Sequence, residues 1–240
     1  MMTKDIQIGI VGHYTRQDQI KQLAKEVKAD SVCLDEGGVG CEENHLRAWR
    51  SLAWIGAEWC VVLEDDAVPV SELREELAKM LPHAPTPVVS LYLGRKRPPQ
   101  YQDSVAQVIG LDSPFIMTDL YTHGVGICVK WNFVPSLIAY LELRKRRVEE
   151  SLEEQLPIDE LIAEWVQGKG LEISFTNPSL VNHADGPTVL DFHPSRDKEE
   201  DMSTREPGRV AWRFGTRESW EGDSIRLPDP GTWYESPVNK

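Results

Sequence analysis

The sequence predicts an α/β fold with a mixed, mainly parallel sheet flanked by helices, and three observations support this class. The chain opens with an alternating strand pattern at 6–11, a helical spacing of apolar residues at 17–27 and a second strand at 31–34. Two strands joined by a helix form a parallel pair with a right-handed crossover. Residues 59–63 are continuously apolar, which is typical of a strand covered on both faces. The 240 residues suffice for one sizeable domain of this class.

The other elements follow from local patterns. Leu46, Trp49 and Leu52 have the spacing of a one-sided helix that begins after Gly40. Ser71 is a suitable N-cap for a helix through 80. The remaining expected elements are strands at 88–93, 121–129 and 171–175, a long polar loop at 94–104, and helices at 133–152 and 157–168.

The end of the chain differs from the rest in composition. From Asp191 onward, charged residues, glycines and prolines recur without a clear period, yet Trp212, Trp220 and Trp233 lie among them. Large aromatic side chains favour burial, so we expect this segment to pack on the main domain. The chain is therefore divided into an α/β domain at 1–190 and an irregular, aromatic-containing C-terminal extension at 191–240.

The composition disfavours some partners and compartments. The net charge is −13, a poor match for DNA or an anionic membrane, both of which bind clusters of Lys and Arg. The spacings of Cys33, Cys41, Cys60 and Cys128 fit no zinc template, so reduced and largely buried thiols are expected. No signal peptide is visible, nor any apolar run of about 20 residues that could span a bilayer. We expect a soluble, cytoplasmic protein.

Three consecutive carboxylates, Glu64, Asp65 and Asp66, follow the apolar strand directly. The carboxyl end of a central strand is where ligands bind in open α/β sheets. Carboxylates there are costly unless they are solvated, paired or bound to a cation. Their oxygens suit Mg²⁺ or Mn²⁺, ions that usually share their coordination with phosphate. A solvated acidic turn is the simpler interpretation of the same residues.

The region around this triplet resembles a known group of enzymes. The segments Gly40-Cys41-Glu42-Glu43-Asn44-His45 and Val62-Leu63-Glu64-Asp65-Asp66-Ala67 are similar to the G-C-x-x-S-H and V-L-E-D-D-A motifs of glycosyltransferase family 25. That family has the GT-A fold, which carries a D-x-D or E-D-D element at a strand end. Asn44 replaces the serine of that family and is closer to the pattern of family 2. The layout also resembles small glycosyltransferases of bacteriophages.

The resemblance implies that the first loop and the end of the second strand hold the nucleoside of a nucleotide sugar, such as a UDP-sugar. His13, Thr15, Arg16 and Asp35 occupy these places. Asn44 would face the donor. Ordinary loop polarity explains the same side chains equally well.

The resemblance also implies a metal site. Asp66, with Glu64 or Asp65, would hold Mn²⁺ or Mg²⁺ against the diphosphate, and Glu64 and Asp65 would contact the donor. His183 would complete the coordination, with His193 as a second candidate. A lone histidine is more often an ordinary polar side chain.

The last implied roles concern the sugar and the acceptor. Gly124 lies in a run that passes beside the donor sugar in the related enzymes, although packing alone can require a glycine there. Asp159, at the start of a late helix, would deprotonate the acceptor hydroxyl in an inverting displacement, with Glu160 as the second candidate. Acids in a first helical turn are also good capping residues without any catalytic role.

These residues predict a metal-dependent glycosyltransferase that uses a nucleotide sugar, with a glycan, a protein or a modified DNA base as acceptor. Two alternatives stay open. A metal-dependent phosphodiesterase or nuclease would need a second acidic cluster, and none is evident in the sequence. A catalytically inactive GT-A fold that serves as a binding module would not require Asn44 and Asp159 together with the acidic triplet.

Overall fold

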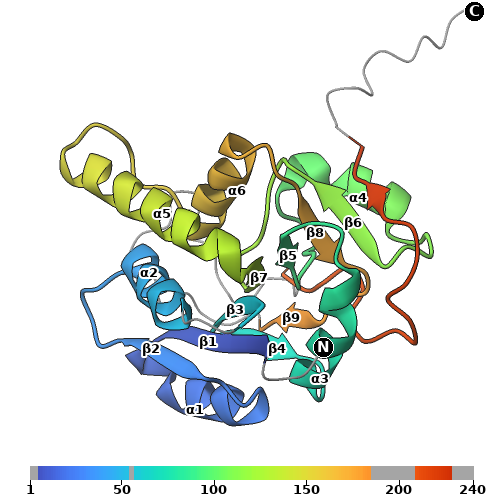
Figure 1. The fold of residues 1–240 in the computed structure, drawn as a ribbon, viewed down its shortest axis with the longest axis horizontal. Helices are drawn as coiled ribbons and strands as arrows, with labels where there is room; N and C mark the ends of the chain where they lie inside the picture. Colours follow the sequence, from blue (N-terminus) through green and yellow to red (C-terminus); the bar gives the residue numbers. More distant parts are fainter. Residues whose placement is uncertain (1–4, 54–56, 185–208, 229–240) are drawn as a thin grey trace, which may run out of the picture.

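The computed structural model describes residues 5–53, 57–184 and 209–228, which form a large sheet, a small sheet and the helices around them (Figure 1). The eight-stranded sheet has the order β10-β6-β8-β5-β7-β3-β1-β2, and β4 and β9 form a separate pair. The strands are β1 (Ile6–His13), β2 (Ser31–Asp35), β3 (Trp59–Glu64), β4 (Ala67–Pro69), β5 (Val88–Ser90), β6 (Phe115–Thr118), β7 (Gly126–Lys130), β8 (Ile173–Thr176), β9 (Val181–His183) and β10 (Ile225–Arg226). The helices are α1 (Gln17–Glu26), α2 (Cys41–Leu52), α3 (Leu73–Met80), α4 (Gln102–Val108), α5 (Val134–Glu149) and α6 (Ile158–Gly168).

The sheet is mixed and mainly parallel, which confirms the predicted fold class. β1 pairs in parallel with both β2 and β3, and β5 pairs in parallel with β8. β7 lies between β3 and β5 and is antiparallel to both. It follows that β1, β2, β3, β5 and β8 run in one direction. Their carboxyl ends meet at one edge of the sheet, and this edge carries the acidic triplet.

Helices cover both faces of the sheet, with α2, α5 and α6 on one side and α1 and α3 on the other (Figure 1). Trp49 of α2 and Trp165 of α6 are buried in the same core cluster as Val62 of β3. Val61, the neighbouring residue of β3, is buried with Leu77 of α3 in the other cluster. Because β3 is covered on both faces, its sequence is continuously apolar. Within the described residues, no helix is long and apolar enough to cross a membrane.

The described part of the C-terminal extension contacts the main domain. The backbone N–H of Trp212 donates to the carbonyl of Leu93 at 2.9 Å, and β10 pairs with β6 at the edge of the large sheet. Trp220 is buried. Trp233 and the boundary after residue 190 lie outside the described residues, and the division of the chain into two parts stays a prediction.

The predicted N-cap of α3 is wrong. The helix begins at Leu73, its N-cap is Glu72, and Glu72 has a φ of 56° and makes no side-chain cap. The reason lies upstream, since β4 pairs with β9 and the N–H of Val70 still donates to Leu180. The chain is therefore held against β9 until shortly before Ser71 and turns sharply into the helix.

Other local predictions need correction. The polar stretch 94–104 is not a loop throughout, because a 3₁₀ turn at Pro99–Tyr101 leads into α4. The strand expected at 121–129 begins only at Gly126. β4 and β6 were not predicted, because strands of three and four residues depend on their partners more than on their own pattern.

Candidate functional site

The acidic triplet lies where the large and small sheets meet. Glu64 ends β3, and Asp65 and Asp66 form the turn before β4. β4 pairs with β9 so that Ala67 lies opposite His183. This pairing brings the Nε2 atom of His183 to 3.5 Å from Oδ2 of Asp66. Residues more than a hundred positions apart thereby meet at the edge formed by the strand ends.

Asp65 is bound by the first loop on both of its oxygens. Arg16 donates from Nη1 to Oδ1 of Asp65 at 2.5 Å, and the backbone N–H of His13 donates to Oδ2 at 2.8 Å. The same Arg16 nitrogen also donates to Oδ2 of Asp66 at 3.1 Å. Asp65 is therefore committed to holding the loop after β1, and of the three carboxylates it is the least suited to bind a metal.

Asp66 carries the features of a cation ligand. Burial raises the pKa of Asp66 to about 7, and the charge of Glu64 adds to this effect while Arg16 opposes it. Its Oδ1 atom is buried and has no hydrogen-bond partner in the described part of the chain. An unsatisfied buried carboxylate oxygen costs free energy, and a bound cation would remove this cost.

The carboxylate of Glu64 lies next to His45 and Gly124. His45 Nε2 lies 3.3 Å from Oε1 of Glu64, and a Cβ atom on Gly124 would approach the same oxygen to 2.5 Å. Burial opposes the ionisation of Glu64, but His45 and then His183 outweigh it and lower the pKa of this carboxyl. The ionised form of Glu64 is thus favoured, and a side chain larger than that of glycine at position 124 would displace this carboxylate.

Asp35 and Asn44 support the ends of β1 and β2. Asp35 is buried and accepts backbone hydrogen bonds from Gly37, Val39 and Gly40 at 2.8, 3.2 and 2.9 Å. Burial alone would raise its pKa, but these N–H groups lower it. Asn44 donates from Nδ2 to carbonyls of β1 and β2 at 3.2 and 3.0 Å. Both side chains shape the loops around the strand ends, and their contact with a donor stays a prediction.

The first loop carries the polar side chains of His13 and Thr15. His13 Nδ1 lies 2.8 Å from the hydroxyl of Thr15. Thr15 is exposed and His13 is half-buried, so part of this pair faces solvent at the carboxyl end of β1. The two residues lie next to Arg16, which places all three predicted donor contacts of this loop at the same edge as the triplet.

The start of α6 lies next to Glu64. A Cβ atom on Gly124 would lie 3.5 Å from Ile158, the first residue of α6, as well as 2.5 Å from Glu64. Burial raises the pKa of Asp159 to about 6, and the charge of Glu64 contributes to the same shift. Oδ1 of Asp159 accepts a hydrogen bond from the N–H of Glu160 at 3.1 Å. Glu160 is exposed, so Asp159 is the better placed of the two predicted bases.

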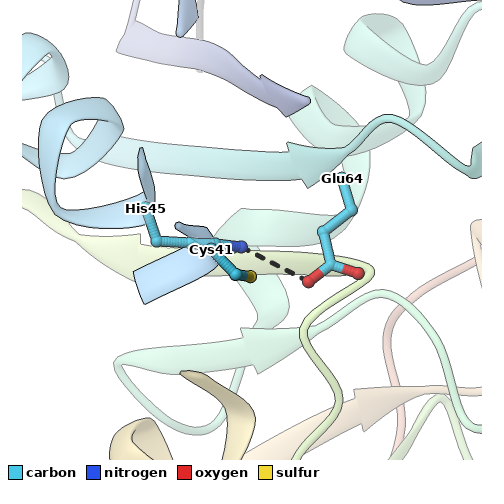
Figure 2. A group of neighbouring side chains, drawn as sticks. All are labelled: Cys41, His45 and Glu64. Atoms are coloured by element: carbon cyan, nitrogen blue, oxygen red, sulfur yellow. Dashed lines mark hydrogen bonds and ion pairs between the residues drawn. The ribbon is translucent and has the colours of Figure 1, made fainter. Parts of the chain in front are cut away.

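Three residues near the triplet were not predicted as site residues. His45 and Cys41 lie one turn apart on α2 and point toward Glu64 (Figure 2). In the sequence, the available signal for this pair was the spacing of four residues, which places two helical side chains on the same face. His123 packs edge-on against Tyr92 with ring centroids 5.1 Å apart, and burial, then the charge of His183, lower its pKa to about 4. It is therefore neutral near pH 7, and nothing local in the sequence distinguishes it.

The cysteines are free thiols, as predicted. Cys60 and Cys128 are buried, whereas Cys33 and Cys41 are half-buried. Burial, followed by the charge of Glu64, raises the pKa of Cys41 well above its ordinary value. Cys41 is thus a protonated thiol near pH 7 unless a cation binds beside it.

Comparisons with known proteins yield similarities in structure alone. No protein-family model and no curated protein matches the chain. A Drosophila β1,4-galactosyltransferase 7 mutant in complex with manganese, UDP-Gal and xylobiose is 9% identical with a TM-score of 0.46, covering 84% of this chain and 81% of that chain. A glycosyltransferase involved in the glycosylation of the major capsid of PBCV-1 is 13% identical with a TM-score of 0.34, covering 76% and 94%.

A third similar structure is mannose-1-phosphate geranyltransferase from Thermus thermophilus, which is 13% identical with a TM-score of 0.38 and covers 72% of this chain and 73% of that chain. The similar structures therefore include glycosyltransferases and another transferase. Because these similarities concern the general fold, the function is inferred below from the side chains at the strand ends.

Proposed function

We propose that this protein is a metal-dependent glycosyltransferase, which moves a sugar from a nucleotide sugar, such as a UDP-sugar, to an acceptor hydroxyl. The observation that carries the proposal is the meeting of Glu64, Asp66 and His183 beside Arg16 at the carboxyl edge of the sheet. Anionic and cationic side chains at one strand edge suit a ligand that combines a divalent cation with a diphosphate.

The side chains fit a resident Mn²⁺ or Mg²⁺. Carboxylate oxygens from Asp66 and Glu64 are the donors that these ions prefer, and the Nε2 atom of His183 is an acceptable third. The buried Oδ1 of Asp66 needs a partner, and none is found within the described residues. When bound, the metal would neutralise the negative charge that develops on the diphosphate leaving group.

The protein's own groups would bind and orient the donor. Arg16 keeps a guanidinium next to Asp66, where it would contact the diphosphate as a second cation. His13 and Thr15 line the adjacent loop and would contact the nucleoside. Asp35 and Asn44 hold the ends of β1 and β2 in place, so that the backbone of this edge is preorganised for binding.

Asp159 would accept the proton of the attacking hydroxyl. A pKa of about 6 keeps this carboxylate ionised at neutral pH, yet close enough to neutrality to be an effective general base. Inversion of the anomeric centre belongs to this proposal through the resemblance to glycosyltransferase family 25 alone. Glu160 is the second candidate.

Membership of glycosyltransferase family 25, in a bacteriophage-type branch, is part of the same proposal. It is supported by the segment 40–45 at the start of α2 and by the segment 62–67, which covers the end of β3, the following turn and the first residue of β4. A cytoplasmic location and a glycan, protein or modified DNA base as acceptor belong to this proposal as well.

A thermal-shift screen tests the proposal. Purified protein is heated with a panel of nucleotide sugars, each with Mn²⁺ and with chelator, because a ligand that binds the native state raises the melting temperature. We expect stabilisation by one class of nucleotide sugar that depends on Mn²⁺ and is lost in Asp66→Asn. Stabilisation that is equal with and without metal would contradict the proposed metal bridge.

A further inference from the structure

A second group of potential metal ligands includes Glu64 but neither Asp66 nor His183. Cys41 and His45 project from α2 toward Glu64 at the end of β3 (Figure 2). One ligand atom of each residue, a sulfur, a ring nitrogen and a carboxylate oxygen, lies within 4.8 Å of the other two. The fold thus gathers a thiol, an imidazole and a carboxylate at the end of β3.

The fold holds this group in place. Gly40 has a φ of +85°, a conformation that favours glycine, and starts α2 immediately before Cys41. Cys41 and His45 are four residues apart and therefore share one face of the helix. His45 is 1% exposed and Trp49, one turn further on, is fully buried, so core packing fixes α2 against the sheet.

The kinds of ligand atom in this group determine which metal it would bind. Thiolate sulfur and imidazole nitrogen are ligands of Zn²⁺, whereas Mg²⁺ and Mn²⁺ prefer oxygen. Zinc sites with three protein ligands usually have water at the fourth position. We propose that Cys41, His45 and Glu64 form a Zn²⁺ site, with water as the fourth ligand, which shares only Glu64 with the proposed site for the donor metal. On binding, the Cys41 thiol releases its proton to solvent.

The shared residue makes this site regulatory. Glu64 is a proposed ligand of the donor metal, and its Oε1 already lies 3.3 Å from His45. A Zn²⁺ ion held by Cys41 and His45 would compete with the donor metal for the Glu64 carboxylate. This consequence rests on the proposed function, and it predicts that Zn²⁺ weakens Mn²⁺-dependent nucleotide binding.

Cobalt spectroscopy of the full chain tests the site itself. Co²⁺ replaces Zn²⁺ in such sites and gives a near-ultraviolet absorption only when a thiolate is bound. We expect this band in the wild type and in the matched control Cys33→Ser, which removes another half-buried thiol. We expect it to be absent in Cys41→Ser, with Zn²⁺ affinity lowered more than about 100-fold, beyond what loss of an outer-shell partner costs. A wild-type protein without the band, or a Cys41→Ser protein that keeps it, would overturn the proposal.

A measurement on the wild type avoids any folding defect of the variants. Bound Zn²⁺ should slow alkylation of Cys41, while Cys33 reacts at the same rate with and without metal. Equal protection of both thiols, or of neither, would contradict a specific site. Alkylation and cobalt absorption do not depend on a nucleotide, so they distinguish failure of the zinc site from failure of the proposed transferase function.

The variant Asp66→Asn further distinguishes the two proposed metal sites. This variant should lose Mn²⁺-dependent nucleotide binding and keep the cobalt–thiolate band. In Cys41→Ser, by contrast, nucleotide binding should persist and become insensitive to Zn²⁺. Zinc inhibition that is unchanged in Cys41→Ser would refute the regulatory role of this site.

Discussion

Gly124→Ala tests how tightly the position of Glu64 is set. A Cβ at residue 124 would lie 2.5 Å from Oε1 of Glu64, whereas ordinary contact begins at 3.4 Å. The carboxylate must therefore retreat by roughly 1 Å, and a displacement of this size in a preorganised site can cost about 100-fold in rate. We expect Gly124→Ala to lower Mn²⁺-dependent transfer of sugar from the donor by about this factor, measured as release of nucleotide diphosphate.

Two other glycines provide controls. Gly126→Ala also introduces a close contact, at 3.1 Å, but the contacted atom belongs to the apolar side chain of Leu63. At Gly110, a Cβ meets nothing within 4 Å. Transfer should be almost unchanged in Gly110→Ala, and any loss in Gly126→Ala should follow its melting temperature. If Gly124→Ala is folded and as active as the wild type, Glu64 does not take part in the way proposed here.

The remaining predictions concern the base and the fold. Asp159→Asn should bind the donor normally and lose at least about 100-fold in transfer, and the wild-type rate should rise with pH through about 6 as Asp159 ionises. A near-normal rate in the variant, or a flat pH profile, would show that Asp159 has no catalytic role and only contributes to the first turn of α6. Arg74 is buried and donates to the carbonyls of Ile6 and Lys28 and to Asp30 at 2.8, 2.7 and 2.7 Å. Arg74→Met should lower the free energy of unfolding by about 3 kcal/mol in urea titrations, because it leaves these acceptors without their charged donor; a loss below about 1 kcal/mol would contradict this account.

The parts of the fold that depend on local pattern were predictable from the sequence. The apolar run of β3 and the spacing of Leu46, Trp49 and Leu52 on α2 are direct consequences of burial, and the structure shows them as expected. The position of Glu64, Asp65 and Asp66 at a strand end follows from the same pattern. The short strands β4 and β6 were missed because tertiary pairing creates them.

The division of roles among the three acids could not be predicted. Neighbouring carboxylates look equivalent in sequence, yet Arg16 and His13 occupy both oxygens of Asp65. Only the pairing of β4 with β9 brings His183 to Asp66, and this pairing leaves no local signal. The sequence patterns of known zinc sites did not predict the group of Cys41, His45 and Glu64 for a similar reason, since its third ligand comes from another element.

The most direct test of the central claim is calorimetry of nucleotide diphosphate binding. Wild-type protein is titrated with UDP and the other nucleoside diphosphates in Mn²⁺ and in chelator, and the titrations are repeated with Asp66→Asn. The proposed site predicts binding of at least one nucleotide by the wild type in Mn²⁺, and none in chelator or in the folded variant. Equal affinity in all three conditions, or no binding of any nucleotide by the wild type in Mn²⁺, would contradict a donor site built on Asp66.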